Sequence, residues 1–65
     1  MEYTNSQIKA LIDEYIHSLR NRAIMTARLI DGLTFEQIAE LVEMSPRQVR
    51  TIVHRHEHTL FKHCL

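Results

Sequence analysis

The chain has 65 residues, of which 45% are hydrophobic and 25% charged, and its formal net charge is zero. A chain of this length forms one domain and buries only about 60% of its unfolded surface, so we expect dimerisation or a partner to add stability. No apolar run approaches the roughly 18 residues of a membrane span, and the single cysteine, Cys64, fits a reducing, cytoplasmic setting. Scarce glycine and the absence of alternating β-branched runs predict an all-α fold of three to four helices.

The first predicted helix covers residues 5–19. Thr4 and Gln7 have the spacing of a capping box, in which each side chain accepts a hydrogen bond from the other residue's backbone N–H. The helix then carries an apolar stripe at helical spacing, made of Ile8, Leu11, Ile12, Tyr15, Ile16 and Leu19. We expect this amphipathic helix to pack on the rest of the domain.

The second predicted helix covers residues 21–31 and ends at Gly32, which takes a left-handed conformation freely. Its expected buried side is Ala23, Ile24, Ala27 and Ile30, and its expected outer side is Arg20, Arg22 and Arg28. The start of this helix is ambiguous because the helical spacing of apolar residues continues from Leu19 to Ala23 without a change of phase. Either the chain breaks near residues 18–21, or one helix of roughly 40 Å covers residues 5–31 and needs a partner chain. We favour the break.

Two further helices are predicted at residues 35–43 and 46–62. Each begins with a complete capping box, and Pro46 adds a residue that suits the first helical position because its missing N–H costs nothing there. The boxes are Thr34 with Gln37 and Ser45 with Gln48. Two helix starts eleven residues apart leave room for a short helix and a tight turn, which is the layout of a DNA-binding helix-turn-helix.

Charge is segregated between these two helices. From Asp31 to Glu43 the chain carries four acids and no base. After Met44 it carries four bases, Arg47, Arg50, Arg55 and Lys62, against one acid, Glu57. A neutral chain with one basic helix can still bind DNA, although its electrostatic steering is modest.

The stretch LIDGLTFEQIAELVEMSPRQVRTIVHR resembles the fourth region of bacterial sigma factors and related response-regulator domains. It looks closest to small sigma-like transcriptional regulators encoded by phages. The shared pattern is I-D-G-L-T-[FW]-E-x-I-A-E followed by S-x-R-x-V, which places residues 20–62 in the sigma-like part and 1–19 outside it. That family usually has glycine in the turn between these two helices, where Glu43 stands here. A non-glycine residue in a left-handed conformation costs on the order of 1 kcal/mol. The turn of this chain could therefore differ in shape from that of the family.

The resemblance implies that helix 46–62 enters the major groove. Arg47 and Arg50 can each donate two hydrogen bonds to a guanine, worth about 1–3 kcal/mol of discrimination. The residues expected at the bases are Pro46, Arg47, Arg50, Thr51 and His54, and those expected at phosphates are Arg28, Thr34, Gln37, Gln48 and Arg55. The alternative is that these arginines only form the solvated face of an amphipathic helix, and the paired capping boxes favour DNA binding over it.

The segment His54–His58 contains H-x-x-E-H, a pattern found in zinc peptidases. Such an enzyme needs a third ligand further along, and seven residues follow His58, so we expect no enzyme and no cofactor. An alternative is a zinc site shared with a second copy through His54, His58 and either His63 or Cys64. We favour a polar helix face that uses histidine and holds no metal.

The sequence therefore predicts a sequence-specific regulator that binds double-stranded DNA. One such motif contacts about four or five base pairs, so we expect a homodimer on an inverted repeat. Its interface is expected at the stripe Ile8–Leu19 or at the tail Leu60–Leu65. One alternative is a protein-interaction module that docks on RNA polymerase or mimics a sigma-factor region, and another is the DNA-recognition part of a terminase or recombinase.

Overall fold

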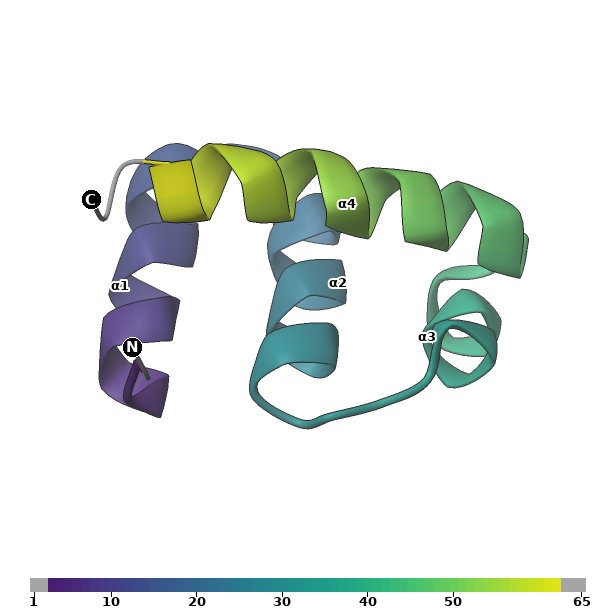
Figure 1. The fold of residues 1–65 in the computed structure, drawn as a ribbon. Coiled ribbons are helices and arrows are strands. Elements are labelled where there is room, and N and C mark those ends of the chain that lie inside the picture. The colour runs from purple at the N-terminus through teal and green to yellow at the C-terminus, as the bar shows by residue number, and fades with distance from the viewer. Residues whose placement is uncertain (1–2, 63–65) are drawn as a thin grey trace.

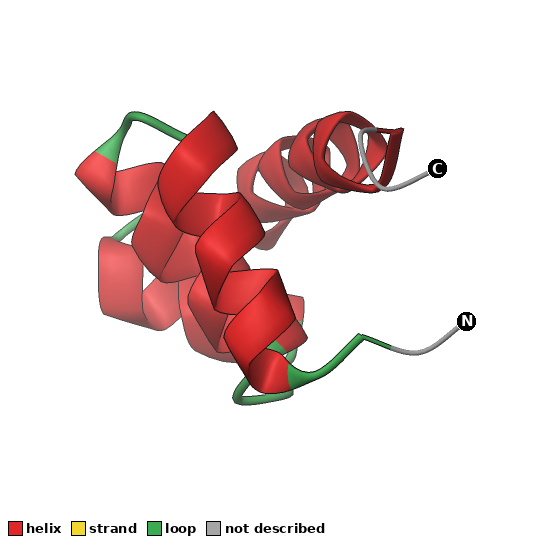
Figure 2. Cartoon of the chain, turned by 90° about the vertical axis from the view of Figure 1, so that its left-hand side faces the viewer, coloured by secondary structure: helices red, strands yellow, loops and turns green. Residues whose placement is uncertain are grey.

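Four helices and no strand are present in residues 3–62, the part of the chain that the computed structural model describes (Figures 1 and 2). They are α1 (Asn5–Tyr15), α2 (Leu19–Leu29), α3 (Phe35–Val42) and α4 (Pro46–Lys62). α1 and α2 run side by side in opposite directions, and α4 lies across them with its first turns over α3 (Figure 1). The predicted all-α class is confirmed. None of the described helices is long and apolar enough to cross a membrane.

All three predicted capping boxes are present. In each, the threonine or serine hydroxyl accepts from the glutamine backbone N–H at 3.1–3.2 Å, and the glutamine Oε1 accepts from the cap N–H at 2.8–3.1 Å. The pairs are Thr4 with Gln7, Thr34 with Gln37 and Ser45 with Gln48. Each pair satisfies two N–H groups that a helix start otherwise leaves without intrahelical partners.

The favoured break between the first two helices is confirmed, but it lies earlier than predicted. Ile16 has an extended backbone, with φ −115° and ψ 116°, and the Ser18 hydroxyl caps α2 by accepting from the Asn21 N–H at 3.3 Å. Helices predicted at residues 5–19 and 21–31 are therefore Asn5–Tyr15 and Leu19–Leu29. Restarting the helix at Ser18 rotates the next residues, so Leu19 is 79% exposed and Ala23 is exposed, both contrary to expectation.

Arg22, predicted to lie outside, is half-buried and joins the first two helices. Its Nε donates to the Ile16 carbonyl, and one terminal nitrogen donates to the Asp13 carbonyl at 2.8 Å. These carbonyls lie at the end of α1, where backbone acceptors lack intrahelical donors. The guanidinium of Arg22 can donate to two of these carbonyls while the alkyl part of its side chain covers apolar surface. These contacts explain why Arg22 is half-buried.

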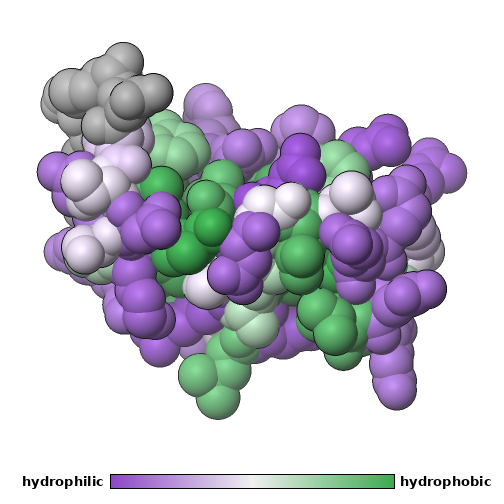
Figure 3. All heavy atoms as spheres, turned by 90° about the horizontal axis from the view of Figure 1, so that it is seen from below, coloured by the Kyte–Doolittle hydropathy of each residue, from purple (hydrophilic) through white to green (hydrophobic). Residues whose placement is uncertain are grey.

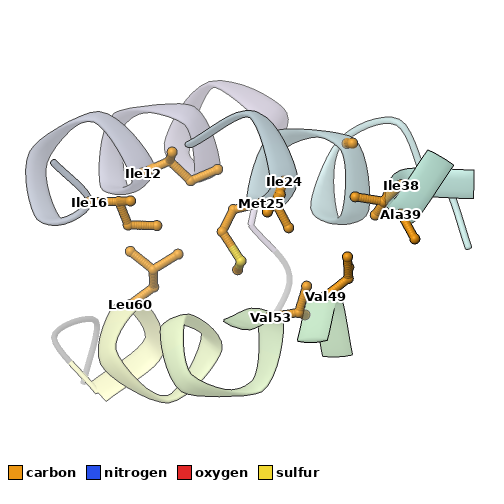
Figure 4. Close-up of a cluster of buried hydrophobic side chains, with 10 residues drawn as sticks. Ile12, Ile16, Ile24, Met25, Ile38, Ala39, Val49, Val53 and Leu60 are labelled. Atoms are coloured by element: carbon orange, nitrogen blue, oxygen red, sulfur yellow. The ribbon is translucent and has the colours of Figure 1, made fainter. Parts of the chain in front are cut away.

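One apolar core joins all four helices (Figure 4). Leu60 of α4 points toward Ile12 and Ile16 of α1, while Val49, near the start of α4, faces Ile38 of α3 (Figure 4). The buried set is Ile12, Ile16, Ile24, Met25, Ala27, Ile38, Ala39, Val49, Val53 and Leu60. α1 is thus an integral part of the domain, and α4 is held along its whole length.

This core takes up three residues of the expected dimer interface. Ile12, Ile16 and Leu60 are almost completely buried within a single chain, so the stripe Ile8–Leu19 does not present them to a second copy. Of the expected tail, residues 63–65 lie outside the described part of the chain. Seen from the side opposite α4, apolar side chains reach the surface in areas interrupted by hydrophilic ones (Figure 3).

Candidate nucleic-acid interface

The turn between α3 and α4 keeps a left-handed residue although it lacks glycine. Glu43 has φ 56° and ψ 44°, and the following Met44 N–H donates to the Ala39 carbonyl at 3.0 Å. A left-handed conformation at this point reverses the chain after α3 and lets Ser45 begin α4. Glu43 therefore accepts the strain that glycine would avoid.

Replacing Glu43 with glycine is expected to stabilise the domain by about 1 kcal/mol. The change removes the steric cost of a Cβ in the left-handed conformation, and it removes an acidic charge from the C-terminal end of α3. Part of this gain is lost because glycine has a greater backbone entropy in the unfolded chain. Thermal unfolding should show a rise of about 4–8 °C per kcal/mol for a chain of this size. The control is Glu40→Gly within α3, which should lower stability by about 1 kcal/mol. A Glu43→Gly protein that melts below wild type would contradict the strain.

The five residues expected at bases lie together on the first three turns of α4, and all are exposed. Arg47, Arg50, Thr51 and His54 are spaced i, i+3, i+4 and i+7, so they share one helical face, which we call the recognition face. On this face the Thr51 hydroxyl donates to the Arg47 carbonyl at 3.1 Å. His54 places its Nδ1 3.6 Å from the Glu57 Oε1. The face offers guanidinium donors toward solvent, as base contacts require.

The residues expected at phosphates lie mainly at helix starts. Thr34 and Gln37 cap α3, Gln48 caps α4, and Arg55 is exposed further along α4. The capping boxes use the glutamine Oε1 atoms, so the amide nitrogens are the groups that would donate to a phosphate. Helix N-termini also attract anions through their N–H groups and dipole. The structure thus brings polar donors to both helix starts of the motif.

Arg28 differs from the other expected phosphate residues because it is half-buried rather than outside. One terminal nitrogen donates to the Leu33 carbonyl at 2.9 Å, and the guanidinium carbon lies 4.4 Å from the centre of the Phe35 ring. The loop after α2 exposes this carbonyl, and the ring offers a surface for the guanidinium. Arg28 consequently packs against the start of α3 instead of pointing freely into solvent.

Two apolar residues of the site were missed by sequence reasoning. Met44 and Ile52 line a shallow depression together with Arg47, Gln48 and Thr51. Both are half-buried and pack against the core, Met44 from the turn before α4 and Ile52 from α4 itself. An apolar surface beside residues expected at bases would suit the methyl group of thymine. Only the packed structure shows that these two apolar residues also reach the recognition face.

The histidines do not form a metal centre in the part of the chain that is described, where no three His, Cys, Asp or Glu side chains are grouped for a metal ion. His63 and Cys64, which the zinc alternative invoked, lie outside the described residues. His56 has a different partner, with its Nε2 3.1 Å from the Asn21 Nδ2 on α2. Because Asn21 Oδ1 accepts from Arg20 Nε at 3.4 Å, the amide nitrogen faces the ring and can donate to His56 Nε2 when the imidazole is neutral.

His56 is expected to make folding sensitive to acid. Burial, and then the nearby charge of Arg55, lower the pKa of His56 below its usual value of about 6.5. The folded state therefore binds fewer protons than the unfolded state. The contribution of neutral His56 to folding stability is therefore fully present above about pH 6.5, the pKa in the unfolded state. It is lost as the pH falls from that value toward the lowered pKa of the folded state.

Melting curves at pH 7.5 and pH 5.5 check this expectation. The loss of melting temperature on acidification should be smaller for His56→Gln than for the wild type, because the substituted residue carries no titrating group. His58→Gln, at an exposed position two residues later, should keep the wild-type loss. Equal losses in all three proteins would show that His56 does not couple folding to pH.

Comparison with known proteins agrees with this geometry. A family model described as sigma-70, region 4 matches residues 18–55, and this confirms the sigma-like resemblance. The match begins at the cap of α2 and includes α2, α3 and α4 as far as Arg55, while α1 lies before it. Comparisons with curated proteins and with solved structures give no match.

Proposed function

The chain belongs to the sigma-70 region 4 family of DNA-binding helix-turn-helix modules, and on that premise we propose that it is a sequence-specific transcription regulator. In this proposal α4 lies in the major groove and the recognition face contacts the bases. The observation that supports it most is the exposure of Arg47, Arg50, Thr51 and His54 on one face of a helix held in place by its buried side. The resemblance to small phage-encoded sigma-like regulators favours a phage origin.

Charge supports the same orientation. Residues 46–55 of α4 expose Arg47, Arg50 and Arg55, whereas α3 exposes Glu36 and Glu40. Double-stranded DNA repels the acidic helix and attracts the basic one, so the complex is favoured when α4 rather than α3 is inserted. Because the chain is neutral overall, we expect affinity to depend on a few local contacts and to fall with salt.

Arg55→Ala is expected to weaken binding to every DNA sequence by a similar factor. If Arg55 contacts a phosphate, its loss also reduces the slope of log affinity against log salt by about 1. Fluorescence anisotropy at several salt concentrations, with a selected site and a scrambled duplex, measures both effects. Lys62→Ala removes another exposed charge seven residues later on α4 and serves as the control. An unchanged slope for Arg55→Ala would place its side chain away from the phosphates.

We also propose that two copies bind an inverted repeat, because one motif contacts too few base pairs for a useful site. The core uses Ile12, Ile16 and Leu60 within one chain, so these three side chains do not join the copies. Among the described residues the exposed large hydrophobics are Leu19 and Leu41. Analytical ultracentrifugation with a selected duplex should show two chains of 7.7 kDa per duplex. One chain per duplex at saturation would contradict the dimer.

A second candidate is docking on RNA polymerase, a partner that sigma region 4 domains bind. One observation favours it for this chain: Leu41 of α3 is 70% exposed and lies next to the exposed Glu40. A large apolar side chain beside an acid is typical of a protein contact more than of a DNA contact. Loss of polymerase binding in Leu41→Ala with DNA affinity unchanged would support this candidate.

A further inference from the structure

The Phe35 ring contacts side chains that come from two other helices. The guanidinium carbon of Arg28, on α2, is 4.4 Å from the ring centre, and that of Arg50, on α4, is 5.7 Å from it. The His54 ring centre is 6.3 Å from the Phe35 ring centre, with the planes at 55°. Both guanidinium distances are within the range of a cation–π interaction. The first residue of α3 therefore contacts two members of the recognition face and one expected phosphate residue.

We propose that Phe35 is a positioning residue for DNA recognition, a role that rests on the proposed function. An arginine side chain is long and flexible, and it loses much rotational freedom when two of its N–H groups bind one guanine. A guanidinium held over an aromatic ring is restricted before DNA arrives. The ring attracts the face of the guanidinium, whereas guanine binds its N–H edge, so both contacts can be made together.

Arg28 supplies the fixed side of this arrangement. Its hydrogen bond to the Leu33 carbonyl and its contact with the ring connect α2, the following loop and α3. The ring therefore contacts Arg28 of α2, which is itself fixed by a hydrogen bond, and also contacts Arg50 of α4. Two guanidinium groups also make the start of α3 positive, next to the capped N-terminus and its dipole, although Glu36 follows directly in the sequence. This placement favours a nearby phosphate as well as the base contact of Arg50.

The test compares Phe35→Leu, which keeps an apolar side chain, with Phe35→Trp, which keeps an aromatic one. Phe35→Leu is expected to lower affinity for a selected guanine-containing site by about two- to fivefold, the factor that an exposed cation–π contact provides. Phe35→Trp should stay within about twofold of wild type. Phe61→Leu is the matched control, because Phe61 stacks on Tyr3 with centroids 5.4 Å apart and stands near the C-terminal end of α4, beyond the recognition face.

A double-mutant cycle separates positioning from general destabilisation. Arg50→Ala should cost a smaller factor in affinity in the Phe35→Leu background than in wild type, because the leucine variant has already lost the preorganisation of Arg50. A ring that only stabilises the fold gives independent factors that multiply. Circular dichroism establishes that each variant is folded, and Phe35→Met replaces Phe35→Leu in the cycle if the leucine variant is not.

A measurement on the free protein keeps this inference distinct from the proposed function. In wild type and Phe35→Trp, NMR should show the side-chain CH₂ protons of Arg28 and Arg50 shifted upfield by the ring current, and Phe35→Leu should remove that shift. If the shift is the same in Phe35→Leu, the positioning role is wrong whatever the DNA result. If the shift is present and Phe35→Leu binds as wild type does, the role is wrong while the proposed function stands. If wild type shows the shift but binds no DNA sequence preferentially, the proposed function has failed and the role falls with it.

Discussion

Replacing Arg47 and Arg50 together with alanine is expected to abolish sequence-specific DNA binding without unfolding the protein. Each arginine can provide about 1–3 kcal/mol of base discrimination, so the pair should cost roughly 2–6 kcal/mol, or at least about 30-fold in affinity for a selected site. Both residues are exposed and neither belongs to the buried core, although the Arg50 guanidinium also contacts the Phe35 ring at the edge of that core. Changes at such surface positions usually alter stability by less than about 0.5 kcal/mol.

A second double variant provides the control for this experiment. Arg20→Ala with Lys62→Ala also removes two exposed positive charges but leaves the recognition face intact. Anisotropy with a selected and a scrambled duplex should show that only the first variant loses the difference between the two duplexes. Equal losses in both variants would mean that net charge, rather than base contact, determines binding. Retention of a transcriptional effect by the first variant would favour docking on RNA polymerase.

Replacing Ile38 with alanine is expected to leave the domain largely unfolded at physiological temperature. Ile38 is fully buried in α3, facing Val49 of α4 (Figure 4). Truncating a buried isoleucine typically costs about 2–5 kcal/mol through lost burial and the cavity left behind. A domain of this size has a total stability on the order of 3–10 kcal/mol, so one such change removes a large part of it.

The matched control lies three residues later on the same helix. Leu41 is 70% exposed, and Leu41→Ala should change the stability by about 0.5 kcal/mol or less. Urea unfolding followed by circular dichroism compares the two variants with wild type. Similar losses of stability in both variants would contradict the assignment of Ile38 to the core and of Leu41 to the surface. They would also contradict the orientation of α3 against which α4 packs.

The helix starts were predictable because their signals are local. A capping box joins residues three apart, so Thr34 with Gln37 and Ser45 with Gln48 specify two helix starts before any tertiary contact forms. The sequence accordingly predicts a helix at residues 46–62, which are the bounds of α4 in the structure. The start of α2 was misplaced because Ser18 is followed at the third position by Asn21 rather than by Glu or Gln, so the cap lacks the second half of its pattern.

Contacts between distant residues could not be predicted in this way. His56 and Asn21 are 35 residues apart, and their contact depends on how α4 crosses α2. Arg22 and Arg28 have the sequence pattern of an outer face, yet each donates to a backbone carbonyl that only the folded chain brings near. The contact of Phe35 with two arginines likewise depends on the packing of three helices. Sequence periodicity identifies a buried side, but it does not show which side chains meet there.

Selection of bound duplexes from a random DNA pool tests the proposed function most directly, because every possible half-site competes for the protein in the same experiment. We predict enrichment of an inverted repeat whose half-sites of about four or five base pairs contain guanine, with the enrichment lost in the Arg47→Ala, Arg50→Ala protein. Binding that falls with salt but enriches no sequence from the pool would contradict a sequence-specific regulator.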